Sequence, residues 1–136
     1  MRTKILLAPA ALACSLALSA CGTVTSTSSF KGTEHEVAQV IANLQSATTA
    51  AENGKICSDY LAAAVVSKLG GHKGCEQAIK HQLAQVDNLE MKIESVKVAP
   101  GGKRATVRLK SEYSGNKKST ELPLVEEGGA WRLSGP

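Results

Sequence analysis

The sequence has 136 residues, with 16 Lys and Arg against 12 Asp and Glu and a formal net charge of +4. Aromatic residues make up only 3% of the chain. So modest a charge, with so few rings on which bases could stack, argues against a dedicated nucleic-acid-binding protein. The length fits one domain and leaves no room for a second.

The N-terminal segment has the layout of a signal peptide. It begins with positive charge, continues with an apolar stretch too short to span a bilayer, and ends in the small residues that a signal peptidase needs. These parts are Arg2 and Lys4, residues 5–18, and Ser19-Ala20.

The next residue is Cys21, and the run Leu18-Ser19-Ala20-Cys21 resembles the lipobox of bacterial lipoproteins. In that family the cysteine thiol is acylated and the segment before it is removed. The resemblance implies that residues 1–20 are lost and that Cys21 becomes the lipid-bearing N-terminus. It also implies an exported chain, anchored to the membrane on the extracytoplasmic side. The alternative is an ordinary secretory signal followed by a chance cysteine.

Two cysteines then remain for the folded part, since Cys14 leaves with the signal and Cys21 carries lipid. An even pair outside the cytoplasm most often forms a disulfide, so we expect Cys57 and Cys75 to be bonded. The alternative is a catalytic or metal-binding thiol, but no Cys-x-x-Cys spacing supports it.

Residues 21–32 are rich in Ser, Thr and Gly and lack hydrophobic periodicity, which is typical of a flexible tether. The domain is expected over 33–136, opening with a capping box at Thr33 and Glu36. Apolar residues then recur at helical spacing up to Asn53-Gly54, which we expect to end this first helix in a left-handed turn. They are Val37, Val40, Ile41, Leu44, Ala47 and Ala51.

The next two helices are predicted between this turn and Val86. One begins with Ser58 as N-cap and stops at Gly70-Gly71, and the other runs from about Cys75 to Val86. The Gly70–Gly74 segment between them is predicted to be a loop that returns the chain along the second helix. It would place His72 and Lys73 on the surface.

After Asp87 the hydrophobic period changes to two, which predicts strands. Val96 and Val98 are out of phase with Met91 and Ile93, so we expect a bulge near Glu94-Ser95. Turns at 100–102, 114–116 and 128–129 separate four short strands, and Pro123 interrupts the third. The predicted class is α+β, with three N-terminal helices packed on a four-stranded antiparallel meander.

This order of elements, with the ending Gly128-Gly129-Ala130-Trp131-Arg132-Leu133, resembles small NTF2-like (cystatin-like) domains over residues 33–134. The sequence departs from the usual pattern because no strand fits between the second and third helices. The resemblance implies a cone whose helices and sheet enclose a pocket. Some members of this superfamily are isomerases or dehydratases, whereas others bind small molecules or form dimer contacts.

Acid–base chemistry in such a cone would need titratable side chains that face it. The candidates are Asp59, Tyr60, His81 and Tyr113, and each is better explained by a helix end, a core edge or a solvated face. His72 and His81 flank Cys75, but no carboxylate completes a metal site at a suitable spacing. We therefore assign no catalytic residue, no metal ligand and no cofactor.

The leading hypothesis is a non-enzymatic domain with either of two binding modes. A small apolar ligand would occupy a pocket lined by Leu61, Val65, Leu83 and Val107, or the surface would contact an envelope protein or a second copy of the chain. The alternative is an NTF2-like enzyme with its site in the cone.

Charge is unevenly divided along the mature chain. Residues 91–136 carry nine Lys and Arg against five acids, and residues 21–90 carry five Lys against seven. A solvated outer sheet face, with lysines that discourage edge-to-edge pairing, explains this better than a face that binds anionic lipid.

Overall fold

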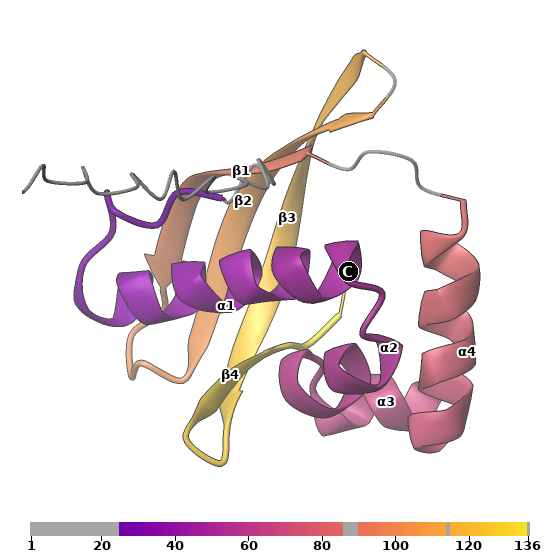
Figure 1. Ribbon diagram of the computed structural model, residues 1–136. Coiled ribbons are helices and arrows are strands. Elements are labelled where there is room, and N and C mark those ends of the chain that lie inside the picture. The colour runs from indigo at the N-terminus through magenta and orange to yellow at the C-terminus, as the bar shows by residue number, and fades with distance from the viewer. Residues whose placement is uncertain (1–24, 86–89, 114, 136) are drawn as a thin grey trace, which may run out of the picture.

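The computed structural model describes residues 25–85, 90–113 and 115–135, so the lipobox from Leu18 to Cys21 lies outside the described part. One antiparallel sheet forms the centre of the fold, and α1 crosses one of its faces (Figure 1). The shorter helices gather beyond the C-terminal end of α1 (Figure 1). The helical elements are α1 (Gly32–Thr49), α2 (Asn53–Lys55), the π-helical turn η1 (Ile56–Tyr60), α3 (Ala63–Lys68) and α4 (Gly71–Leu83). The strands are β1 (Glu90–Val98), β2 (Arg104–Tyr113), β3 (Asn116–Glu127) and β4 (Ala130–Leu133).

The first predicted helix is confirmed, but its start differs from the prediction. Of its predicted apolar stripe, Val37, Ile41 and Ala47 are buried and Val40 and Leu44 are half-buried, whereas Ala51 is exposed beyond the helix end. The predicted capping box at Thr33 is wrong, because the N-cap is Lys31 and no side chain caps the helix. Thr33 lies within the first turn of α1, where its own backbone is already helical.

The end of α1 also lies earlier than predicted. Ala51, not Asn53 or Gly54, takes the left-handed conformation, with a φ of 54°. Two backbone hydrogen bonds fix this end: Ala51 N–H donates to the Thr48 carbonyl at 3.1 Å, and Glu52 N–H donates to the Ala47 carbonyl at 2.9 Å. This is the Schellman pattern, which satisfies carbonyls at the helix end. Asn53 and Gly54 then begin the short helix α2.

The second predicted helix is split in two. Ser58 is not an N-cap, because it lies inside η1. Leu61 forms a parallel bridge with Leu133, and Ala62 N–H donates to the Leu133 carbonyl at 2.8 Å. Because these contacts hold the chain extended along β4, a helix can resume only at Ala63. It ends, as predicted, at the glycine pair, where Gly70 has a φ of 90°.

The third predicted helix begins four residues early, since α4 starts at Gly71 and the segment predicted as a loop is its first turn. Gly74 allows α4 to lie close to the end of α3, because a Cβ there would stand 2.0 Å from the Leu69 carbonyl oxygen. His72 and Lys73 are exposed, as predicted. Val86, the predicted last residue, lies outside the described residues.

The predicted disulfide is present. Cys57 and Cys75 are bonded, with their Cα atoms 6.1 Å apart. The bond joins η1 to α4, and both cysteines are buried. It therefore fixes the shorter helices relative to one another.

The meander is confirmed, with strand order β1-β2-β3-β4 and every neighbour antiparallel. The register shifts between Ile93 and Ser95, where the bulge was expected. Pro123 pairs with Thr106, and its carbonyl accepts a hydrogen bond from Ser134, just past the last β3–β4 pair. Its missing N–H therefore falls where β4 has ended and interrupts little of the ladder.

The expected tether is partly packed against the domain. Thr25 is 6% exposed, and its hydroxyl lies within hydrogen-bonding reach of Gln45 Oε1 and of the Met91 carbonyl. The contacts of the folded domain thus extend to Thr25, before the expected start at Thr33.

Candidate functional site

Around five central core residues, the space between α1 and the sheet is filled by side chains. Val37, Ala38 and Ile41 of α1 face a sheet surface that includes Val107 and Leu124, and each of these five is at most 1% exposed. A side chain with no accessible surface borders no space that a water molecule could enter, so the layers meet at the density of a protein interior. No ligand-sized room adjoins these side chains.

Of the four residues predicted to line one pocket, Leu61 alone lines the surface groove described below. Val107 is fully buried in the core beneath α1. Leu61 lies at the bridge to β4 and lines a surface groove. Val65 on α3 and Leu83 at the end of α4 are half-buried, and neither lines that groove.

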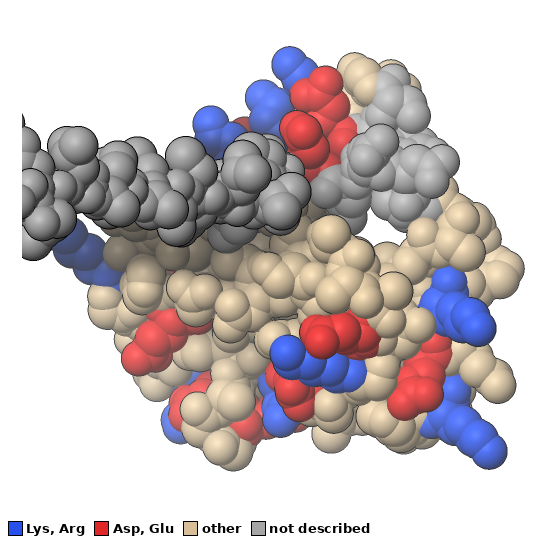
Figure 2. All heavy atoms as spheres, in the orientation of Figure 1, with Lys and Arg blue, Asp and Glu red and all other residues tan. Residues whose placement is uncertain are grey.

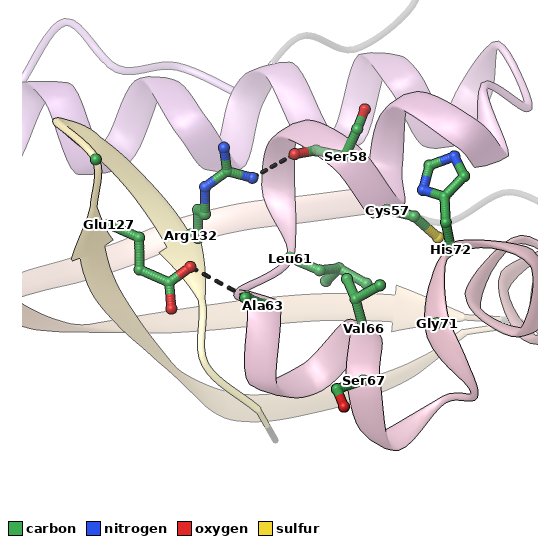
Figure 3. Close-up of a pocket in the computed structure, with 11 residues that line it drawn as sticks. Cys57, Ser58, Leu61, Ala63, Val66, Ser67, Gly71, His72, Glu127 and Arg132 are labelled. Atoms are coloured by element: carbon green, nitrogen blue, oxygen red, sulfur yellow. Dashed lines mark hydrogen bonds between the residues drawn. The ribbon is translucent and has the colours of Figure 1, made fainter.

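This groove is the candidate site. It is open to solvent, has a volume of about 650 Å³, and lies between η1, α3, the start of α4 and the β3–β4 hairpin (Figure 3). Figure 3 shows Leu61 and Val66 in its middle, with Arg132 and Glu127 on one side and His72 on the other. The lining residues are Cys57, Ser58, Leu61, Ala63, Val66, Ser67, Gly71, His72, Glu127, Gly128 and Arg132.

Two charged side chains attach the β3–β4 hairpin to the helical side of the groove. Glu127 Oε2 accepts a hydrogen bond from Ala63 N–H at 3.1 Å, and Arg132 Nη1 donates to the Ser58 carbonyl. Each therefore satisfies a backbone group near an element end, which would otherwise need water. Across the groove, His72 Nε2 lies 2.9 Å from Glu76 Oε1.

Sequence reasoning missed Glu127 and Arg132 as site residues, although part of the signal was present. Arg132 stands between Trp131 and Leu133, which are buried, so strand alternation places it on the opposite face. Glu127 precedes the Gly128-Gly129 turn of the same hairpin. What the local pattern lacked was the contact of η1 and α3 with this hairpin, which depends on the split of the second helix.

The residues considered for acid–base chemistry do not form one constellation. Asp59 is exposed and accepts a hydrogen bond from the Ser58 hydroxyl at 2.9 Å. His81 is exposed on α4 and hydrogen-bonds with Gln85 at 3.1 Å, and Tyr60 is half-buried in η1. None of these three lines the groove, and the side chain of Tyr113 lies outside the described part.

Basic residues of the sheet are interleaved with carboxylates. Lys103 pairs with Glu126 at 2.7 Å, and Arg108 pairs with Glu121 at 2.8 Å. The hydrogen bond and charge of Glu121 raise the pKa of Arg108 above its ordinary value. Figure 2 shows the other face of the fold, which bears α1, and acidic and basic side chains are mixed there too. The pairing favours a solvated face over a single-sign anion-binding one.

Within residues 25–85, 90–113 and 115–135, no three His, Cys, Asp or Glu side chains gather closely enough to hold a metal ion. None of the helices described there is long and apolar enough to cross a membrane.

No protein-family model matches the sequence, and no curated protein matches it at a significant level. Among solved structures, the chain is similar to an NTF2-like transpeptidase from Campylobacter jejuni, with 14% identity and a TM-score of 0.51. The match covers 72% of this chain and 96% of the other. This likeness supports an NTF2-like fold. The helices differ from the expected three, because η1 and α3 replace one continuous helix.

Two further structures are similar at lower TM-scores. The intermembrane-space region of the chloroplast protein ARC6 has 12% identity and a TM-score of 0.47, with 78% of this chain and 95% of that one covered. A de novo designed protein with a curved β-sheet has 17% identity and a TM-score of 0.38. That match covers 46% of this chain and 58% of the designed protein.

Proposed function

We propose that this chain is a bacterial lipoprotein of the cell envelope, cleaved before Cys21 and acylated on that cysteine. Its NTF2-like domain serves as a non-enzymatic protein-interaction module on the extracytoplasmic side of the membrane. The lipobox-like run Leu18-Ser19-Ala20-Cys21 supports this localisation. The Cys57–Cys75 disulfide supports it independently, because such bonds persist in oxidising compartments.

The packing between α1 and the sheet carries the choice of an interaction module. Other NTF2-like folds use the cone for a substrate or ligand, but here Val37, Ile41 and Val107 occupy that space with no accessible surface. An apolar ligand placed there would have to displace them, at a cost comparable to that of overpacking a core, about 1–3 kcal/mol or more. The surface is therefore the better candidate for binding.

Replacement of Cys21 tests the membrane address. We express Cys21→Ser in a bacterial host that acylates lipoproteins. We expect the variant not to incorporate an alkyne-tagged fatty acid and its processed form to be absent from the membrane fraction. Cys14→Ser is the matched control, because Cys14 lies inside the removed segment and should leave labelling unchanged. Undiminished labelling of Cys21→Ser would contradict the proposed anchor.

Cross-linking in intact cells tests the interaction role. A lysine-reactive reagent should trap the acylated chain in a discrete complex with another protein. A tightly bound small molecule recovered from the interior would instead favour the ligand-binding hypothesis and overturn the module.

A further inference from the structure

The groove between η1, α3 and the β3–β4 hairpin combines an apolar floor with paired polar groups. Resting on the proposed interaction function, we propose that it is the docking site for an extended polypeptide segment that carries an apolar side chain. Its walls come from elements far apart in the sequence. These elements are joined by the Glu127–Ala63 and Arg132–Ser58 hydrogen bonds and by the buried Cys57–Cys75 disulfide.

The floor supplies the apolar part of the recognition. Leu61 and Val66 line the groove and are half-buried, so both retain surface that a partner could cover. Burial of this surface by a partner side chain is the driving term for docking.

Glu127 and Arg132 supply the polar part. One oxygen of Glu127 holds Ala63 N–H, and a carboxylate can accept further hydrogen bonds through its other lone pairs. Arg132 uses Nη1 on the Ser58 carbonyl, and a guanidinium has five N–H donors. An acceptor and a donor at one side of the groove match the N–H and C=O of an extended backbone, which offers one of each per residue.

Other occupants fit this geometry less well. A small-molecule pocket encloses about 70–90% of its ligand, whereas this groove is largely open to solvent. An anionic lipid surface would be matched by positively charged side chains alone, but both Glu127 and Arg132 line this groove. An open groove with opposite charges and an apolar floor favours a polypeptide.

The walls are also held in place before any partner binds. The disulfide joins η1 to α4, and the hydrogen bonds of Glu127 and Arg132 tie the hairpin to η1 and α3. A groove ordered in advance spends less binding free energy on conformational entropy, which favours capture of a flexible segment.

The test uses the acylated chain in phosphatidylethanolamine–phosphatidylglycerol vesicles and a random peptide library displayed on phage. Selection should enrich peptides with a shared apolar position. A synthetic peptide of the enriched sequence is then titrated against four proteins: the wild type, Val66→Glu, Glu127→Gln and Ala64→Glu. The melting temperature of each variant verifies that it is folded.

Val66→Glu should weaken binding at least about tenfold, because it puts a charge in the apolar floor. Glu127→Gln keeps an acceptor for Ala63 N–H but loses charge, and should weaken binding about fivefold. Ala64→Glu adds the same charge to α3 at an exposed position that does not line the groove, and should stay within about twofold of the wild type.

Failure to enrich any peptide, or equal binding by Val66→Glu and wild type, would overturn the groove inference. If cross-linking in cells still yields a protein partner, the proposed function survives with its interface elsewhere. If neither assay finds a polypeptide, both the docking site and the interaction module are wrong.

Discussion

Ala51 ends α1 with a left-handed φ of 54°, a conformation that costs a residue with a Cβ about 1–2 kcal/mol. The backbone hydrogen bonds from Ala51 and Glu52 to Thr48 and Ala47 hold it there. Thr48 and Thr49 turn their hydroxyls back to the carbonyls of the preceding turn, which adds to the order of this helix end. The strain is thus a local property of one residue and can be removed by one substitution.

We predict that Ala51→Gly raises the free energy of unfolding by about 1 kcal/mol, because glycine adopts a positive φ without the Cβ clash. Ala50→Gly is the matched control. Ala50 is the neighbouring exposed residue with an αR backbone, so glycine there should lower stability by about 0.5–1 kcal/mol. Urea denaturation measures both changes. Equal destabilisation by the two variants would contradict the assignment of the strain to Ala51.

The glycines of the Gly70–Gly74 segment explain why it was wrongly predicted to be a loop. Gly70, Gly71 and Gly74 look like a loop, because glycine is a poor helix former. Gly70 and Gly71 do take positive φ values, but Gly74 serves close packing inside α4. The distinction depends on the position of the Leu69 carbonyl, which is a tertiary fact that spacing alone does not contain.

At the scale of elements, the hydrophobic periodicity of the sequence predicted those helices and strands that depend mainly on local interactions. The helix of α1, the four strands and the bulge near Ser95 each depend on neighbouring residues and were found. The prediction of one continuous second helix was wrong because Leu61 pairs with Leu133 near the other end of the chain. That pairing created the groove, so the candidate site could not be predicted while the helix was taken as continuous.

The disulfide acts between elements, since it ties η1 to α4 over a sequence separation of 18. We predict that the double variant Cys57→Ala/Cys75→Ala loses about 3 kcal/mol of unfolding free energy, mainly because its unfolded chain is less restricted. Guanidinium denaturation of wild type and variant measures the loss. A control double variant, Ser58→Ala/Ser67→Ala, changes exposed residues of η1 and α3 and should stay within about 0.5 kcal/mol of wild type.

A loss below about 1 kcal/mol in the cysteine variant would mean that packing alone holds η1 against α4. The groove would then not need the disulfide for its shape, and its walls would be held before binding by packing and hydrogen bonds.

At the scale of the whole molecule, the layers meet without a cavity beside the central core residues, and the open concavity lies outside them. The sequence predicted an α+β meander, and the similarity to an NTF2-like transpeptidase supports that architecture. The hydrophobic pattern of the sequence could not predict whether the space beneath α1 is open or filled, because this depends on how closely α1 approaches the sheet. Small residues such as Ala38 and Ala42 on the buried face of α1 allow the close approach.

We propose a lipid-anchored domain that binds through its surface and not through the space beneath α1. Native mass spectrometry of the chain extracted from the membranes of its own organism tests this most directly. We predict the mass of residues 21–136 with an acylated Cys21 and an oxidised Cys57–Cys75 pair, free of any small molecule, alone or with a protein partner. A chain that retains residues 1–20, or one that carries a tightly bound small ligand, would contradict it.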